Sequence, residues 1–90
     1  MKLIFRQHAI RRMFERCISL SDIEHVIQNG RVIEDYPDDS PYPSQLWLGE
    51  RDGRALHVVQ AINSDERIII TAYEPDPALW SDDFSARRKP

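Results

Sequence analysis

The chain lacks the features that mark secreted and membrane proteins. Its 90 residues contain one cysteine, Cys17, so no disulfide can form within the chain. The apolar run at Ile68–Ile70 is far shorter than the roughly 20 residues that a membrane-spanning helix needs. The first residues carry neither the apolar segment nor the small-residue cleavage site of a signal peptide. We therefore expect a cytoplasmic location and no association with a membrane.

Sequence motifs for metal and nucleotide binding are also missing. The three histidines, His8, His25 and His57, lie in distant segments without the close spacing of zinc ligands. The three glycines do not form a phosphate-binding loop. We therefore expect no metal site and no cofactor. Cys17 falls on the apolar side of the first predicted helix, which favours a small buried residue over a nucleophile.

The overall composition is that of a single globular domain with segregated charge. Hydrophobic residues make up 41% and charged residues 30% of the chain. We assign residues 1–81 to one α+β domain and the polar residues 82–90 to a flexible tail. The net charge is −3, yet residues 1–17 carry five lysines and arginines against one glutamate. This basic segment either binds phosphate groups or is simply a solvated helix face.

Hydrophobic periodicity predicts two helices in the first third of the chain. The first covers residues 6–17, and the second begins at Ser21, where Ser21-Asp-Ile-Glu24 matches a capping box. Gly30 is expected to end the second helix in the left-handed conformation. The short link between the helices predicts a helix hairpin. The apolar stripe of the first helix comprises Ala9, Ile10, Met13, Phe14 and Cys17.

Alternating apolar residues and turn motifs predict a four-stranded antiparallel sheet after the helices. Residues 2–5 are either a short strand or a lead-in to the first helix. Asp52-Gly53 is typical of a two-residue hairpin turn, and the three prolines within residues 36–44 predict a long loop. We expect an α+β fold in which an N-terminal helix hairpin packs on this sheet. The predicted strands are residues 31–35, 45–50, 54–62 and 67–74.

The last two predicted strands carry residues suited to proton transfer. If Ala61 lies opposite Ile69, then His57 and Tyr73 share one face of the sheet. An imidazole titrates near neutral pH, so His57 is a candidate general acid or base. His57 is equally well explained as a core histidine if that face packs on the helices.

Four sequence motifs together resemble a small bacterial family of uncharacterised domains. They are His8-Ala9-x-x-Arg12-Met13-x-x-Arg16-x-Ile18, Asp35-Tyr36-Pro37 with Pro41-Tyr42-Pro43-Ser44, Gly53-Arg54-x-Leu56-His57-Val58-Val59 and Tyr73-Glu74-Pro75-Asp76-Pro77-x-x-Trp80. The last motif is the most specific of the four, and the resemblance covers residues 6–80. Cys17 stands where this family commonly has glycine.

Members of this family are similar to the RelE-type and MqsR-type toxins of toxin–antitoxin systems. The resemblance implies a RelE-like two-layer fold and a domain that cleaves messenger RNA, alone or on the ribosome. It also implies a cognate antitoxin protein that neutralises the domain. RNA or the ribosome and this antitoxin are therefore the expected partners. RelE-type toxins are usually strongly basic, whereas this chain carries a net charge of −3.

The candidate catalytic residues are those that metal-independent RNA cleavage requires. The reaction needs a base for the 2′-hydroxyl, an acid for the 5′-oxygen and cations for the phosphate. We predict a catalytic set of His57, Arg67, Tyr73 and Arg12, in which the two guanidinium groups stabilise phosphate charge. Tyr73 would donate to the phosphate or stack on a base. The residues expected to contribute to RNA binding are His8, Arg11, Arg16 and Arg54.

The acidic, proline-rich loop is a second candidate surface. Its residues Tyr36, Asp38, Asp39 and Tyr42 combine aromatic rings with negative charge, which suits a basic segment of an antitoxin. A loop that only covers the edge of the sheet would have the same composition.

Three functional hypotheses follow from the sequence. The first is a toxin-like endoribonuclease, an mRNA interferase of a type II toxin–antitoxin system. The second is a non-catalytic protein-binding domain with the same fold. The third is a metal-dependent enzyme, which the scattered histidines favour least.

Overall fold

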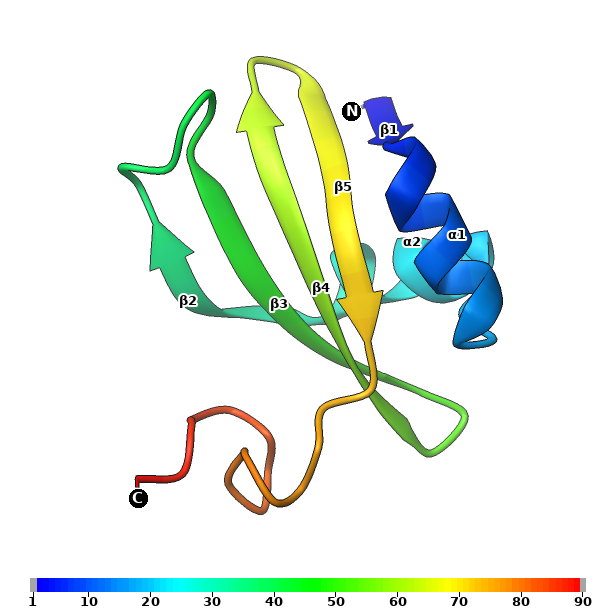
Figure 1. Cartoon of the computed structure of the whole chain (residues 1–90), viewed down its shortest axis with the longest axis vertical. Coiled ribbons are helices and arrows are strands. Elements are labelled where there is room, and N and C mark those ends of the chain that lie inside the picture. The colour runs from blue at the N-terminus through cyan, green and yellow to red at the C-terminus, as the bar shows by residue number, and fades with distance from the viewer. Residues whose placement is uncertain (1, 90) are drawn as a thin grey trace.

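The computed structural model describes residues 2–89, which form two helices and one five-stranded sheet (Figure 1). The sheet order is β1-β5-β4-β3-β2, with β1 parallel to β5 and the other neighbouring strands antiparallel. Neither helix in these residues is long and apolar enough to cross a membrane. The elements are β1 (Lys2–Phe5), α1 (Gln7–Glu15), α2 (Leu20–Asn29), β2 (Arg31–Tyr36), β3 (Ser44–Arg51), β4 (Arg54–Asn63) and β5 (Glu66–Tyr73).

The predicted α+β class is confirmed, but the predicted four-stranded antiparallel sheet is wrong. β1 adds a fifth strand along the edge of β5, from the Lys2–Glu66 pair to the Phe5–Ile69 pair. The four residues of β1 are too few to show an alternating pattern. Its partner lies at the other end of the domain sequence, so the parallel pairing leaves no local signal.

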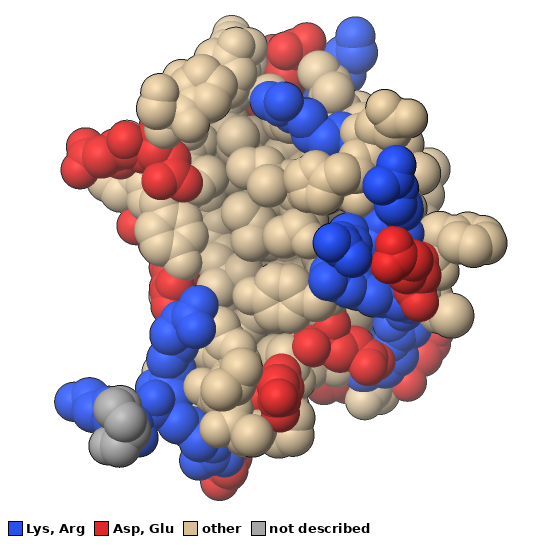
Figure 2. Space-filling view, in the orientation of Figure 1, with Lys and Arg blue, Asp and Glu red and all other residues tan. Residues whose placement is uncertain are grey.

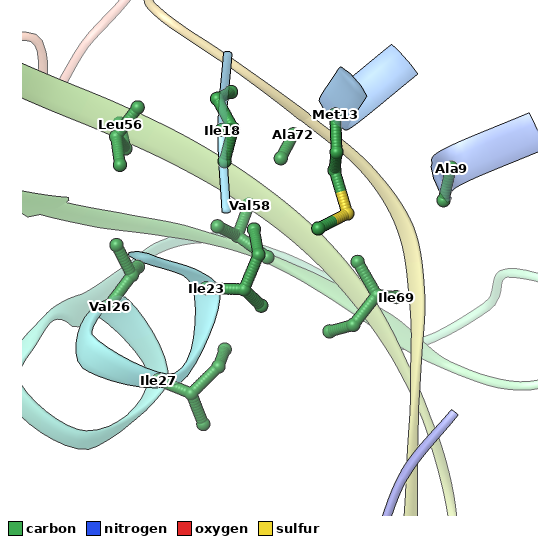
Figure 3. Packing of buried hydrophobic residues seen from close by; sticks show 10 residues of the cluster. All are labelled: Ala9, Met13, Ile18, Ile23, Val26, Ile27, Leu56, Val58, Ile69 and Ala72. Atoms are coloured by element: carbon green, nitrogen blue, oxygen red, sulfur yellow. The ribbon is translucent and has the colours of Figure 1, made fainter. Parts of the chain in front are cut away.

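Both helices cover one face of the sheet, here called the helix-covered face. α1 packs on β5, and α2 packs on β3 and β4. Figure 3 shows side chains from both helices gathered against those of β4 and β5. Burial of these apolar groups is the main force that holds the two layers together. The core comprises Ala9, Met13, Ile18, Ile23, Val26, Ile27, Leu56, Val58, Ile69 and Ala72.

The predicted helix hairpin is wrong because the two helices pack on different strands. α1 spans Gln7–Glu15, which is shorter than predicted, and it buries only Ala9 and Met13. Ile10 and Phe14, which the sequence assigns to the apolar stripe, are 54% and 85% exposed. A nine-residue helix lying over β5 buries one narrow stripe, so its second apolar column faces outward.

Cys17 is exposed rather than buried, because α1 ends before it. Its φ of 55° is in the left-handed region that favours glycine, and the chain changes direction there. A glycine at this position would adopt the same conformation without the steric cost of a Cβ atom. The buried place that the sequence assigns to Cys17 is taken by Ile18, which is 4% exposed.

α2 begins at Leu20, with Ser19 as its N-cap. The Ser19 hydroxyl accepts from the Asp22 amide at 3.0 Å, and the Asp22 carboxylate accepts from the Ser19 amide at 2.9 Å. The predicted capping box at Ser21 and Glu24 is therefore wrong by two residues, because the same spacing of polar residues occurs twice. The backbone hydrogen bond from Ser19 is the main cause that holds the pKa of Asp22 below its usual value.

Gly30 and Gly49 allow α2 to lie close to β3. The φ of Gly30 is −84°, so the predicted left-handed conformation is wrong. A Cβ atom on Gly30 would lie 2.5 Å from the Leu48 carbonyl oxygen, and one on Gly49 would lie 2.8 Å from Val26 Cγ2. The two glycines are therefore required by close approach.

The pairing of β4 with β5 confirms that His57 lies opposite Tyr73. The predicted pair of Ala61 and Ile69 is wrong, because a β-bulge shifts Ala61 onto Ile68. The predicted two-residue turn between β3 and β4 is confirmed, since both of its residues have positive φ.

Residues 75–89, here called the C-terminal segment, fold back toward one end of the sheet (Figure 1). Trp80 is 3% exposed and forms a β-bridge with Arg87. The Arg88 amide donates to the Leu79 carbonyl oxygen at 2.9 Å. The sequence predicts a flexible tail from residue 82, whereas the structure places that stretch in these contacts.

Candidate functional site

The face of the sheet opposite the helices, here called the open face, presents an ordered array of side chains. Paired residues of antiparallel strands point to the same side, so the register places them in rows across β2, β3, β4 and β5. Figure 2 shows this face as a hollow of uncharged atoms, with acidic atoms at its upper left, basic atoms at its lower left, and mainly basic atoms at its right. The rows are Arg31, Leu48, His57 and Tyr73; then Glu34, Leu46, Val59 and Thr71; then Tyr36, Ser44, Ala61 and Ile68.

His57 is fully buried on the open face under the C-terminal segment. Its Nε2 lies 2.9 Å from the Phe84 carbonyl oxygen, and its Nδ1 lies 3.3 Å from the Tyr73 hydroxyl. The Trp80 ring packs edge-on against the imidazole, with ring centroids 4.4 Å apart. A carbonyl oxygen only accepts, so Nε2 carries the proton and donates. In the neutral ring Nδ1 then accepts from the Tyr73 hydroxyl.

Burial keeps both members of this pair neutral near pH 7. Loss of hydration lowers the pKa of His57, and the hydrogen bond to the Phe84 carbonyl offsets part of that change. Loss of hydration also raises the pKa of Tyr73 above its usual value. Both imidazole nitrogens are engaged within the protein, so His57 is placed to orient Tyr73. The alternative of a buried histidine with satisfied ring nitrogens thus agrees with the structure, except that the C-terminal segment and not a helix covers the ring.

Arg16 extends from the end of α1 toward the row that contains Thr71. Its Nη1 donates to the Ala72 carbonyl oxygen at 2.7 Å and lies 3.5 Å from Thr71 Oγ1. A cavity of about 420 Å³ is lined by Arg16, Tyr73 and Glu74. A guanidinium, a phenol and a carboxylate therefore border one space at the end of β5.

Arg54 connects the end of β5 to the backbone that follows α1. Its guanidinium forms an ion pair with Glu74 and donates to the Cys17 carbonyl oxygen at 3.1 Å and to the Arg16 carbonyl oxygen at 3.4 Å. The last carbonyls of α1 lack helical partners, and a cation there also interacts favourably with the helix dipole. Arg54, which the sequence assigns to RNA binding, thus fixes the backbone that carries Arg16.

Two residues of the predicted catalytic set lie away from the cavity. Arg67 is at the opposite end of β5 from Tyr73, about 20 Å along the strand, and it donates to the carbonyl oxygens of Ser64 and Glu66. Arg12 is exposed on α1 and forms an ion pair with Glu15 at 3.4 Å. The structure thus brings together His57 and Tyr73 but neither predicted arginine.

The remaining predicted RNA-binding residues, His8 and Arg11, are exposed on α1. They lie on the same helix as Arg12 and Arg16, so α1 presents cations along its length. Figure 2 shows basic atoms on the side of the hollow where Figure 1 draws α1. The basic segment therefore borders the open face.

The acidic loop also borders the open face instead of forming a separate surface. Tyr36 lies in the third row of that face, and its hydroxyl donates to the Glu34 carboxylate. This hydrogen bond is the main cause that raises the pKa of Tyr36 to about 12. The Ser44 hydroxyl donates to Asp39, Asp38 is exposed and Tyr42 is half-buried.

Glu34, Glu74 and Arg87 are potential site residues that sequence reasoning missed. Glu34 lies on the open face, Glu74 lines the cavity, and the Arg87 guanidinium stands 4.8 Å from the centre of the Trp80 ring. A single carboxylate in a strand has no sequence signature of its own. The adjacency of Glu74 to Tyr73 in the most specific motif was the one signal that pointed to it.

A second cavity of about 460 Å³ separates the start of β2 from the C-terminal segment, with Arg31, Glu50 and Asp82 in its lining. Arg31 and Asp83 approach to 4.0 Å across it. Within residues 2–89, no three histidine, cysteine or carboxylate side chains are grouped as metal ligands. The cavity that adjoins Tyr73 places a phenol with a raised pKa beside a guanidinium and a carboxylate, so it is the better placed of the two for chemistry on a bound ligand.

The chain belongs to the family described as domain of unknown function DUF4258, whose model matches residues 5–74. The matched range includes Arg16, His57, Tyr73 and Glu74 and ends before Trp80. The open face and its cavity thus fall within the family region, and the segment that covers His57 falls outside it. Neither the curated proteins nor the solved structures contained a match to this chain.

Proposed function

We propose that this domain is a toxin-like endoribonuclease of a type II toxin–antitoxin system, with its site on the open face. The observation that carries the proposal is the meeting of Arg16, Tyr73 and Glu74 around one cavity. The two helices followed by an antiparallel meander support the RelE-like comparison, although β1 adds a strand to it. The basic α1 beside the hollow supplies a local positive field despite the net charge of −3.

Each residue of the cavity has a role in metal-independent cleavage. Arg16 binds the scissile phosphate, because only Nη1 is engaged in its two hydrogen bonds and a guanidinium has five donors. Glu74 accepts the 2′-hydroxyl proton while the 2′-oxygen attacks phosphorus. The bond from phosphorus to the 5′-oxygen breaks, and that oxygen takes the Tyr73 proton. The products are a 2′,3′-cyclic phosphate and a 5′-hydroxyl, and the proton on Glu74 returns to Tyr73 through water.

His57 acts in this scheme as the residue that positions Tyr73. Its Nδ1 accepts from the Tyr73 hydroxyl in the resting state and fixes the phenol at the cavity. Arg67 and Arg12 have no role in the bond-breaking step, and Arg12 contributes to RNA binding along α1 instead.

The proposal is tested by RNA cleavage and by growth on controlled induction of the gene. Glu74→Gln is expected to lower the cleavage rate by about 10²-fold or more, since it removes the base while keeping the shape of the side chain. Glu24→Gln, on the exposed surface of α2, is the matched control and should cleave normally. Unchanged cleavage and growth arrest in the Glu74→Gln variant would show that the cavity is not the site.

A second candidate function is a non-catalytic protein-binding domain, which the cover over His57 favours. Trp80 and the Phe84 carbonyl close the imidazole from solvent. Within residues 2–89, β2 is an edge strand whose outer side pairs with no other strand, and Asp38 and Asp39 follow it in the chain. A basic antitoxin segment would add to this edge and pair with the carboxylates. This function predicts that a co-expressed antitoxin binds the wild type and binds the Asp38→Asn and Asp39→Asn variants less tightly. It also predicts that the domain does not cleave RNA.

A further inference from the structure

We propose that the open face contains a guanine-binding subsite in which Glu34 recognises the base of the nucleotide whose phosphate is bound at Arg16. The inference rests on the proposed function, because it names the substrate that the same face would select. Its support is the arrangement of charge along the middle row of that face.

The middle row has a cation at one end, a carboxylate at the other and an apolar floor between them. Its residues Glu34, Leu46, Val59 and Thr71 lie on four adjacent strands, so the backbone positions at its two ends are about 14 Å apart across the sheet. Arg16 Nη1 lies 3.5 Å from Thr71 Oγ1, so its guanidinium marks one end of the row. A nucleotide measured from its phosphate to the edge of its base would fit within the distance between the two ends.

Glu34 has the chemistry to select one base. The Tyr36 hydroxyl donates to Oε1 and orients the carboxylate, which as an anion accepts about four hydrogen bonds in all. Guanine has two adjacent donors, N1–H and the N2 amino group, which match two carboxylate oxygens. Adenine and cytosine place a ring acceptor beside their amino group, and uracil has one donor between two carbonyls. Guanine is therefore the base that a single carboxylate prefers.

Aromatic and guanidinium groups border the place where the base would lie. Tyr36 lies two residues from Glu34 on the same strand, and its pKa is raised mainly by the hydrogen bond to Glu34 and lowered by Arg87. Tyr73 lies at the β5 end of the neighbouring row, beside Arg16. Besides burial, which raises the pKa of Tyr73 most, Arg87 lowers that pKa and Glu34 raises it. The charges of Arg87 and Glu34 thus act on the same part of the open face. Phenol rings and guanidinium planes are the groups on which unpaired RNA bases stack.

The test measures nucleotide binding in the full chain carrying Glu74→Gln, so that cleavage does not interfere. Calorimetric titrations with 3′-GMP, 3′-AMP, 3′-CMP and 3′-UMP are expected to show that GMP binds about tenfold more tightly than the others. 3′-IMP lacks the N2 amino group and should lose most of this advantage. Equal binding of the four nucleotides would overturn the inference.

Two further variants identify the groups responsible. Adding Glu34→Gln should remove the preference for GMP, whereas adding Arg16→Gln should weaken all four nucleotides to a similar extent. Glu24→Gln is the matched control for both and should retain the preference. A GMP preference that survives Glu34→Gln would show that another group recognises the base.

The binding titrations and the cleavage assay test the guanine subsite and the cleavage step separately. A preference for GMP in the variant, with no RNA cleavage by the wild type, would leave the subsite standing and overturn the cleavage step. Cleavage by the wild type without any base preference in binding would overturn the subsite alone.

Discussion

The two faces of the sheet are built from alternate residues of the same strands but have different tasks. On β4, Leu56 and Val58 face the helices and belong to the apolar core, whereas His57 between them faces the open side. The core side chains of the helix-covered face are apolar and only pack. The open face contains Tyr73, whose pKa is raised by burial, and Glu34, whose carboxylate accepts a hydrogen bond from Tyr36. The comparison separates the residues that stabilise the fold from those that have chemistry to offer.

Burial alone does not distinguish these two classes. His57 and Leu56 are both 0% exposed, but a helix covers Leu56 and the C-terminal segment covers His57. Leu56 is enclosed between the sheet and a helix, so truncating its side chain would lower the free energy of unfolding strongly. A cover formed by one short segment makes the His57 position one that local opening would expose.

The largest effect is expected for truncation on the helix-covered face. Ile23→Ala should lower the free energy of unfolding by about 2–5 kcal/mol, because it leaves a cavity among fully buried apolar side chains. Urea unfolding followed by circular dichroism measures the change. Val59→Ala, on the half-buried floor of the open face, should cost clearly less. Equal losses in the two variants would contradict the division between the faces.

The second largest effect is expected in cleavage by Tyr73→Phe. Loss of the hydroxyl should slow RNA cleavage by about 10²-fold, because the 5′-oxygen loses its proton donor. The free energy of unfolding should change by only about 1 kcal/mol, the usual size for one hydrogen bond. Tyr42→Phe, in the acidic loop, is the control that keeps its cleavage rate. Large destabilisation by Tyr73→Phe with normal cleavage would reverse the assignment.

A moderate effect is expected in the pH dependence of stability. The folded state lowers the pKa of His57, so protonation favours the unfolded chain. The contribution is fully present above the unfolded pKa of about 6.5 and is lost as the pH falls from there through the folded pKa. Unfolding curves between about pH 8 and pH 5 should show this loss. It should disappear in His57→Gln and remain in His8→Gln, and a slope unaltered by His57→Gln would exclude this cause.

The smallest effect is expected on the outer side of α1. Phe14→Ser should leave the free energy of unfolding within about 0.5 kcal/mol, because the Phe14 ring is 85% exposed and contributes little to the core. A loss of unfolding free energy as large as that of Ile23→Ala would show that Phe14 is buried, as the predicted apolar stripe and helix hairpin require. Thermal and urea unfolding measured together would decide the point.

Local signals predicted much of the fold, and non-local contacts account for what was missed. The turn between β3 and β4 and the position of His57 opposite Tyr73 follow from short-range pattern and loop length. The parallel pairing of β1 with β5 joins opposite ends of the domain and has no local pattern. The exposure of Ile10 and Phe14 was missed because helical spacing shows that residues share a side and not what that side meets.

The candidate site was predictable only in part for a related reason. The sequence identified His57 and Tyr73 because they stand in clear strands that pair directly. It also grouped Arg67 with them. Arg67 is on the same strand as Tyr73 but lies at the opposite end of it. The polar composition of residues 82–90 predicted a flexible tail, because the hydrogen bond between His57 and the Phe84 carbonyl oxygen depends on the folded sheet. Residue type thus predicted the chemistry, and three-dimensional position decided which groups meet.

The measurement that tests the central claim most directly is an amide chemical-shift titration of the Glu74→Gln chain with a short single-stranded RNA. The account predicts that the largest shifts fall on the open face, at Glu34, Val59, Thr71 and Tyr73, and at Arg16 beside it. The amides of α2, which lies on the helix-covered face, should stay unchanged. Shifts confined to α2, or none at a saturating RNA concentration, would contradict the assignment of the open face as the functional surface.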